Sequence, residues 1–109
     1  SSTILALKTS EGIVSLSSND ITYVEVFDHN LAYHTTKGIY EVRGRLSDVI
    51  QKLAQKRLIM CNRSFVVNLR YVTRIAKTEV LLENGASIPL GKGLFDEANR
   101  ALIAFLREL

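Results

Sequence analysis

Residues 58–72 read LIMCNRSFVVNLRYV and hold two apolar runs separated by a short polar break. The runs cover residues 58–61 and 65–67, and a third apolar run follows at residues 71–76. Short apolar runs of this kind are typical of buried strands, whose backbone is firmly fixed. The break, Asn62-Arg63-Ser64, is therefore expected at an edge or tip of the fold.

This break offers an amide, a guanidinium and a hydroxyl in three consecutive positions. Arginine is suited to paired hydrogen bonds with guanine, asparagine to adenine, and serine to phosphate. The same residues also fit a turn in which the Asn62 side chain caps the local backbone. The segment by itself leaves both interpretations open.

The composition indicates a single domain spanning residues 1–109. Of these residues 47% are hydrophobic, which is enough for a core. Cys61 has no partner for an internal disulfide, and its apolar neighbours predict a small buried side chain. No apolar run approaches the ~20 residues of a membrane span, and no signal peptide is visible. We expect a cytoplasmic protein, and the serine at position 1 suggests a chain cut from a longer one.

The net charge of +3 is distributed unevenly. Residues 1–36 carry one base and four acids, residues 37–77 carry ten bases and two acids, and residues 78–109 carry three bases and five acids. A basic middle between acidic ends is typical of a chain that binds a polyanion. The alternative is that folding mixes these charges on one surface.

Strand patterns dominate the chain before residue 44. Alternation and β-branched residues predict strands at residues 3–8, 13–17, 21–27, 31–36 and 39–43, with the later ones in an antiparallel meander. Within residues 21–27 the period of two places Ile21, Tyr23, Glu25 and Phe27 on one face. Further on, Asn84-Gly85 between apolar runs predicts a hairpin, and Pro89 belongs at an edge or a strand end.

Two stretches have helical periodicity instead. The first predicts a helix of about three turns, with Ser47 as its candidate cap. Its apolar stripe comprises Leu46, Val49, Ile50, Leu53 and Ala54. The second predicts a C-terminal helix, whose stripe comprises Leu94, Ala98, Ala101, Leu102, Phe105 and Leu109.

Several kinds of chemistry lack a signal in the sequence. His29 and His34 are five residues apart and Cys61 stands alone, so zinc-ligand spacing is missing. No glycine-rich loop has the length and context needed to cradle a phosphate. A Cys61 thiol paired with His29 or His34 as a nucleophile remains open, although nothing orients the histidine. We expect no enzyme, no metal and no cofactor.

Three polar interruptions share one character, since each breaks a strand pattern with groups that can reach base edges or phosphates. They are Asp28-His29-Asn30, Asn62-Arg63-Ser64 and Gly91-Lys92-Gly93. On one face of a rigid sheet they could bind a duplex. The sequence does not show whether they share a face.

These interruptions and the sequence around them resemble the LytTR DNA-binding domain. The resemblance spans nearly the whole chain, and its most specific part is the run at residues 61–68 with Tyr71-Val72 after it. The other matching pieces are Tyr23-Val24-Glu25, His29-Asn30-Leu31, Tyr40-Glu41-Val42-Arg43-Gly44, Leu82-Glu83-Asn84-Gly85, Ile88-Pro89-Leu90 and Lys92.

The resemblance implies a mainly β fold: an elongated stack of small antiparallel sheets with one internal helix and one C-terminal helix. It also implies the C-terminal output domain of a bacterial two-component response regulator. Such a domain binds tandem direct repeats in promoters with loops instead of a recognition helix. The implied partners are double-stranded DNA and a missing N-terminal receiver or sensor domain, with a dimer on DNA left open.

The resemblance assigns base readout to His29, Asn30, Asn62 and Arg63. Phosphate or less specific contacts are assigned to Lys37, Ser64, Arg74, Lys77, Gly91 and Lys92. Arg43, Arg45 and Arg70 are further candidates for electrostatic affinity. One departure is that the family often has a Ser-Arg-Arg-like run where this chain has Gly91-Lys92-Gly93. Because lysine lacks the fork of arginine, a phosphate contact is expected there.

A second function class remains beside DNA binding. The chain could be a β-rich protein-interaction module whose C-terminal helix docks on a partner domain. The two classes differ in salt dependence, because neutralising phosphates releases counterions and makes DNA affinity fall steeply with salt.

Overall fold

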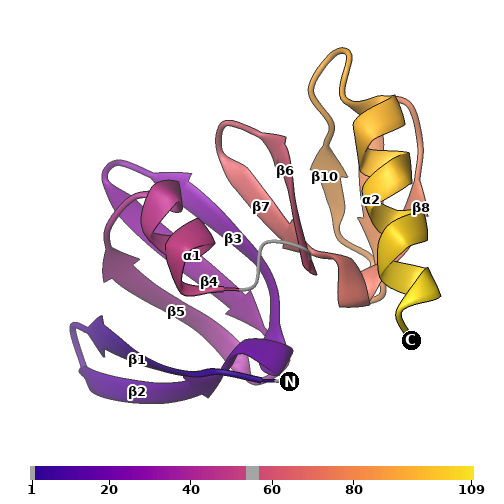
Figure 1. Cartoon of the computed structure of the whole chain (residues 1–109). Coiled ribbons are helices and arrows are strands. Elements are labelled where there is room, and N and C mark those ends of the chain that lie inside the picture. The colour runs from indigo at the N-terminus through magenta and orange to yellow at the C-terminus, as the bar shows by residue number, and fades with distance from the viewer. Residues whose placement is uncertain (1, 54–56) are drawn as a thin grey trace.

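The computed structural model describes residues 2–53 and 57–109, in which strands predominate (Figure 1). In chain order the elements are β1 (Ile4–Thr9), β2 (Gly12–Ser17), η1 (Ser18–Asp20), β3 (Ile21–Phe27), β4 (Asn30–Thr35), β5 (Gly38–Arg43), α1 (Leu46–Lys52), β6 (Leu58–Asn62), β7 (Phe65–Asn68), η3 (Leu69–Tyr71), β8 (Val72–Ile75), β9 (Glu79–Leu82), β10 (Ser87–Pro89) and α2 (Phe95–Arg107).

The strands form three antiparallel sheets. They are a two-stranded sheet β1-β2, a five-stranded sheet β5-β4-β3-β7-β6 and a three-stranded sheet β10-β9-β8. The molecule measures 39 × 30 × 25 Å along its principal axes, with β1 and β2 at one end and α2 at the other (Figure 1). The predicted stack of small antiparallel sheets with one internal and one C-terminal helix is confirmed.

The five-stranded sheet separates two hydrophobic cores. Val24 and Val66 on its central strands pack into a first core with β1, β2 and α1. The neighbouring Val67 points the opposite way, into a second core with the three-stranded sheet and α2. Residues 65–67 therefore serve both cores in alternation, as expected for a run of successive apolar residues in a central strand.

A bulge in β3 corrects one prediction. Ile21 pairs with Thr35 and Tyr23 with His34, so Thr22 is an extra residue in β3. The extra residue reverses the alternation, and Ile21 joins the first core whereas Tyr23 packs against the second. The expectation that Ile21 shares the face of Tyr23 is wrong for this reason.

The internal helix is shorter than predicted. It has seven residues and ends at Lys52, because the backbone of the C-cap residue Leu53 is already extended; Ala54 lies outside the described residues. The cap predicted at Ser47 is also wrong, because the helix begins at Leu46 with Arg45 as its N-cap residue. The Asp48 carboxylate accepts a hydrogen bond from the Arg45 backbone N–H at 3.0 Å and holds this start.

The C-terminal helix α2 packs its apolar stripe on the second core as predicted, and Ala98 and Phe105 are its buried residues. Asp96 and Glu97 lie in the first turn, where negative charge favours the helix dipole. Leu109 follows the C-cap residue Glu108 and is exposed, so its predicted place in the stripe is wrong.

Cys61 is fully buried in the second core, and burial raises the pKa of its thiol to about 12. Because the thiolate is the reactive species, we expect native protein to react with a maleimide far more slowly than urea-unfolded protein. Labelling followed by mass spectrometry measures both rates. Equal rates would contradict the assigned burial and would reopen Cys61 as a nucleophile.

Candidate nucleic-acid interface

The β3–β4 turn, Asp28-His29-Asn30, has an unusual backbone. Asp28 and His29 have φ values of 44° and 64°, in the left-handed region that Asp, Asn and His enter more readily than most residues. The Asn30 side-chain amide donates to the Asp28 carbonyl, and Gly44 N–H donates to the His29 carbonyl at 3.0 Å. These contacts fix the turn while the His29 side chain stays exposed.

The β6–β7 turn is held by Asn62. Its side-chain Oδ1 accepts from Ser64 N–H at 2.8 Å, and its Nδ2 donates to the Pro89 carbonyl at 2.7 Å. Asn62 therefore caps the turn and ties it to β10, as the turn interpretation of this segment predicts. An amide has two N–H groups, so one donor of Asn62 is left for another contact.

Arg63 occupies the tip of this turn and is exposed. Its guanidinium has no hydrogen-bond or ion-pair partner among residues 2–53 and 57–109. The backbone beneath it is fixed by the β6–β7 pairing and by the Asn62 contacts. The chain thus presents a free guanidinium on a rigid support.

Backbone hydrogen bonds join the polar segments into one surface. Val26 N–H donates to the Ser64 carbonyl at 2.9 Å, which places the end of β3 beside the β6–β7 turn. Gly91 N–H donates to the Cys61 carbonyl at 2.7 Å on the other side of that turn. The three polar interruptions predicted from the sequence therefore lie along one edge of the molecule, which is the upper edge in Figure 1.

Gly91 is needed for this close approach. A Cβ atom on Gly91 would lie 3.3 Å from the Cys61 carbonyl oxygen and 3.1 Å from Leu94 Cδ1, both tighter than ordinary packing. Gly93 has φ +84°, a conformation that glycine adopts without strain. The two glycines let the segment turn from β10 into α2 directly beside the β6–β7 turn.

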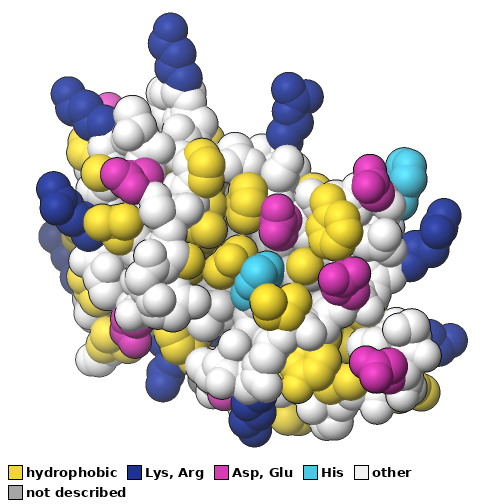
Figure 2. Space-filling model, turned by 180° about the vertical axis from the view of Figure 1, so that it is seen from behind, with side chains coloured by type: hydrophobic (Ala, Val, Ile, Leu, Met, Phe, Trp, Pro, Cys, Tyr) yellow, Lys and Arg dark blue, Asp and Glu magenta, His cyan; other side chains and the backbone are white. Residues whose placement is uncertain are grey.

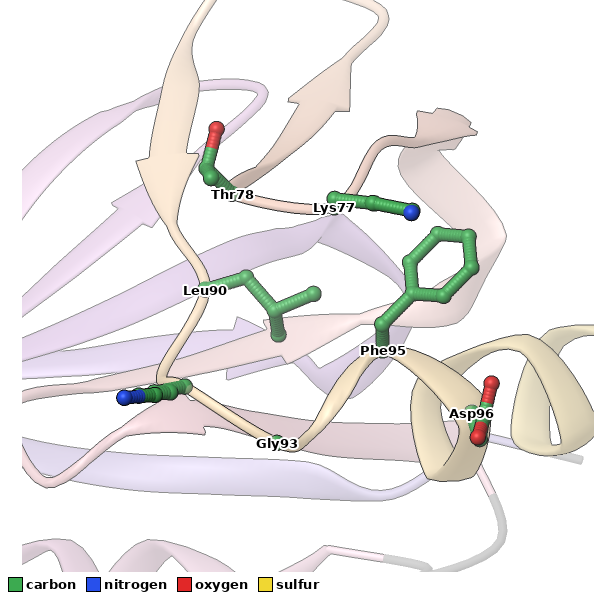
Figure 3. A pocket seen from close by; sticks show the side chains of 7 residues that line it. Lys77, Thr78, Leu90, Gly93, Phe95 and Asp96 are labelled. Atoms are coloured by element: carbon green, nitrogen blue, oxygen red, sulfur yellow. The ribbon is translucent and has the colours of Figure 1, made fainter.

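The turn between β8 and β9 joins the same edge. Leu90 N–H donates to the Thr78 carbonyl at 3.0 Å, and an open hollow of about 400 Å³ lies between this turn and the segment that leads into α2. Lys77 extends over the hollow next to the Phe95 ring, with Leu90 beneath (Figure 3). Lys92 also lines it, so two exposed ammonium groups border one depression, with Asp96 on its far side. We call residues 28–30, 62–64, 77–78 and 91–93 the loop edge.

The loop edge is electropositive. Its four charged side chains are Asp28, Arg63, Lys77 and Lys92, three of them basic. In Figure 2, Lys and Arg side chains project from the upper edge and also from the other edges, whereas the centre of that face carries apolar, acidic and His side chains.

Two arginines that the sequence names only as candidates for electrostatic affinity lie beside the β3–β4 turn. Arg43 pairs with Asn30 across β4 and β5, and Gly44 bonds to His29, so Arg43 and Arg45 flank the turn. Both are exposed. The register of the β4–β5 hairpin is the signal that could have placed them beside this turn.

The remaining predicted residues lie elsewhere. Lys37 is at the opposite end of β4, roughly 20 Å away at ~3.3 Å per strand residue, and its ammonium lies 3.7 Å from Asp20 Oδ2. Arg74 is exposed on the edge strand β8, three residues before Lys77, and borders the loop edge without belonging to it. Arg70 stacks over the Tyr71 ring in η3.

His34 lies opposite Tyr23 on the same face of the five-stranded sheet, away from the loop edge. Its ring stacks on Tyr23 with centroids 4.0 Å apart, and its Nε2 lies 3.7 Å from Glu25 Oε1. Burial lowers the pKa of His34 below its usual 6.5, and the Glu25 carboxylate opposes that shift. Burial prevails, so the fold disfavours the imidazolium.

This shift predicts a pH effect on stability. The unfolded chain binds more protons at His34 than the folded chain between the lowered pKa and 6.5, so stability should fall as pH drops through this range. We expect the His34→Gln variant to lose less free energy of unfolding than wild type between pH 7.5 and pH 5.5. Urea denaturation at both pH values measures this loss. His29→Gln, at an exposed turn, is the control. An unchanged pH dependence in His34→Gln would contradict the assignment.

Among the described residues, no cluster of three or more His, Cys, Asp or Glu side chains could hold a metal ion. None of the helices in residues 2–53 and 57–109 has the length and hydropathy to cross a bilayer.

Comparisons with known proteins agree with this architecture. The family model described as LytTr DNA-binding domain matches residues 11–103, and the chain therefore belongs to this family. The Sensory transduction protein LytT of Bacillus subtilis (strain 168) is 29% identical over 103 residues, which cover 90% of this chain and 43% of that protein. The chain thus spans less than half the length of this relative.

A solved structure has the same fold. It is a LytTr DNA-binding domain of a methyl-accepting/DNA response regulator from Bacillus cereus, with a TM-score of 0.77 and 22% sequence identity. The match covers 94% of this chain and 97% of that chain.

Proposed function

We propose that this chain binds double-stranded DNA sequence-specifically through its loop edge. One observation carries the proposal: the polar segments at residues 28–30, 62–64 and 91–93 adjoin on one edge, with Arg63 unpaired at its middle. Membership in a DNA-binding family supports it. In this proposal His29, Asn30, Asn62 and Arg63 contact bases.

The hairpin of β6 and β7 is the reading element in this proposal. The major groove of B-DNA admits a two-stranded β-ribbon, and Arg63 stands at the tip of such a ribbon. Its guanidinium can donate two hydrogen bonds to guanine O6 and N7. The turn with His29 and the segment with Lys92 lie on either side of this tip and follow the groove and its phosphates.

Phosphate contacts fix the register of the protein on the duplex. We assign them to Ser64, Lys77, Gly91 and Lys92 on the loop edge and to Arg74 beside it. Arg43 and Arg45 are included because they flank the β3–β4 turn. Lys37 is left out, because it lies at the opposite end of the sheet and pairs with Asp20.

We further propose that the chain is the output domain of a bacterial two-component response regulator in the cytoplasm. A receiver or sensor domain would precede it in the full protein, and its DNA targets would be tandem direct repeats in promoters. The relative LytT, of which this chain covers 43%, supports the presence of a further domain.

The test is a selection from random duplex DNA, followed by binding measurements at several salt concentrations. We expect recovered sequences to contain two copies of one motif in the same orientation, about 10 bp or a multiple of it apart. Affinity should fall steeply with salt, with a slope of about −0.9 per neutralised phosphate in a log–log plot. Recovery of no shared motif, or binding that salt does not weaken, would contradict the proposal.

A further inference from the structure

Among the exposed apolar surfaces outside the loop edge, two carry charges of opposite sign. The first is an open hollow of about 390 Å³ between the tip of the β1–β2 hairpin and β5. Ile13 and Ile39 line it and are 71% and 60% exposed. Glu11 and Glu41 lie beside them, which makes the surface acidic at neutral pH. We call these four residues the acidic hollow.

The second surface is the outward side of α2. Ile103 and Leu106 are 49% and 54% exposed there, opposite the buried Ala98 and Phe105. Arg100 and Arg107 are spaced three and four residues from Ile103, so they lie on the same side of the helix. We call Arg100, Ile103, Leu106 and Arg107 the basic helix face.

The charged groups of both surfaces are free. Within residues 2–53 and 57–109, the ion pairs found do not involve Glu11, Glu41, Arg100 or Arg107. Each surface therefore combines two exposed aliphatic side chains with two unpaired charges, and the charges on the two surfaces have opposite signs. Complementary charge sets which surfaces meet and in what register.

The two surfaces lie at opposite ends of the molecule, with β1, β2 and β5 on one side and α2 on the other (Figure 1). One chain therefore cannot bring its own two surfaces together. We propose that a second copy of this chain docks head to tail, with the basic helix face of one copy in the acidic hollow of the next. The inference rests on the proposed DNA binding and names the arrangement of adjacent copies on the duplex.

Head-to-tail contact joins two different surfaces and repeats in one direction. Copies related in this way point the same way along the DNA, which fits direct repeats and does not fit palindromes. Four side chains on each partner make a small contact, which is expected to be weak in free solution. Binding of two copies to one duplex raises their effective concentration and lets such a contact act.

The first test compares duplexes with one and two copies of the selected motif, at several spacings. We expect wild-type protein to bind the two-copy duplex cooperatively at its preferred spacing. Glu11→Arg with Glu41→Arg, or Arg100→Glu with Arg107→Glu, should lower the cooperativity by about tenfold or more through like-charge contact. Cooperativity here is the affinity for two copies relative to that for one, which removes general charge effects.

Matched variants make the result decisive. The fourfold variant, with both ends reversed, restores opposite charges across the contact and should recover cooperativity. Lys52→Glu, on the exposed surface of α1 outside both surfaces, should retain it. Charge-reversed ends that keep full cooperativity, or a fourfold variant that fails to recover it, would overturn the inference while the single-motif affinity still reports on the proposed function.

A second test needs no DNA. Chains with Ile13→Cys are mixed with chains carrying Ile103→Cys under mild oxidation, and buried Cys61 does not compete. The expected result is a mixed disulfide dimer that forms faster than the dimer of either variant alone. Equal rates for all three pairings, or docking of another domain on α2 that leaves the hollow unused, would overturn the head-to-tail arrangement.

Discussion

Replacing Arg63 with alanine should weaken binding to the selected duplex by about 5- to 150-fold, the equivalent of a lost guanine contact worth ~1–3 kcal/mol. Binding to a scrambled duplex should change far less. The reason is geometric: the guanidinium is exposed, unpaired and placed at the tip of a β-ribbon whose backbone is fixed by Asn62. The substitution removes the guanidinium that we propose contacts guanine and leaves the backbone of the β6–β7 turn in place.

Lys77→Ala is the matched comparison, since Lys77 is an exposed cation on the same edge. As a phosphate contact, it should weaken binding to both duplexes about equally and reduce the salt slope by ~1. Fluorescence anisotropy on both duplexes across a salt series measures these effects. An equal loss on both duplexes for Arg63→Ala would make Arg63 a phosphate anchor. Specificity would then have to come from Asn62, from His29 and Asn30, or from DNA shape.

Phe105→Ala should lower the free energy of unfolding by ~3–5 kcal/mol. The Phe105 side chain is 7% exposed within the second core, and the Arg57 guanidinium covers its ring at 5.9 Å from the centroid. Removing the ring opens a cavity between α2 and the sheets. Urea denaturation measures the effect.

The control for Phe105 is Ile103→Ala on the outward side of the same helix, which should change stability by about 0.5 kcal/mol or less. Similar losses for the two variants would mean that α2 does not pack on the second core as described. That outcome would favour the protein-interaction hypothesis, in which the apolar stripe of α2 docks on a partner domain.

The sequence predicted most of the elements because their patterns are local. Residues 65–67 indicated a buried strand, Asn84-Gly85 a hairpin and residues 94–109 an amphipathic helix, which the structure ends at Arg107. The bulge at Thr22 was missed because an extra residue leaves no trace in a β-branched run. The end of α1 was missed because Leu53 continues the apolar stripe although its backbone is extended.

The segments of the proposed site were named from the sequence, whereas their arrangement on one edge depends on pairings between distant segments. The contact of Gly91 with Cys61 and that of Val26 with Ser64 join residues separated by 30 and 38 positions, which no local pattern encodes. The dual hydrogen bonding of Asn62 likewise required the position of Pro89. The place of Arg43 beside the β3–β4 turn could have been predicted, because a turn at residues 36–37 puts it opposite Asn30.

Lys37 shows what a charge count along the sequence leaves out. Lys37 belongs to the basic middle of the sequence, but the direction of β4 places it at the opposite end of the sheet from the loop edge. Its Nζ lies 3.7 Å from Asp20 Oδ2 there. A charge count along the chain does not distinguish the two ends of an antiparallel hairpin. The direction and register of the strands distinguish the two ends, and both are set by the positions of the turns.

The central claim, that the loop edge is the DNA-binding surface, is tested most directly by NMR titration of the 15N-labelled chain with the selected duplex. We predict that amide shifts concentrate at residues 28–30, 62–64, 77–78 and 91–93 and leave residues 36–38 at the opposite end unchanged. Shifts centred on the opposite end, around Lys37 and Arg70, with the loop edge unaffected, would contradict the account.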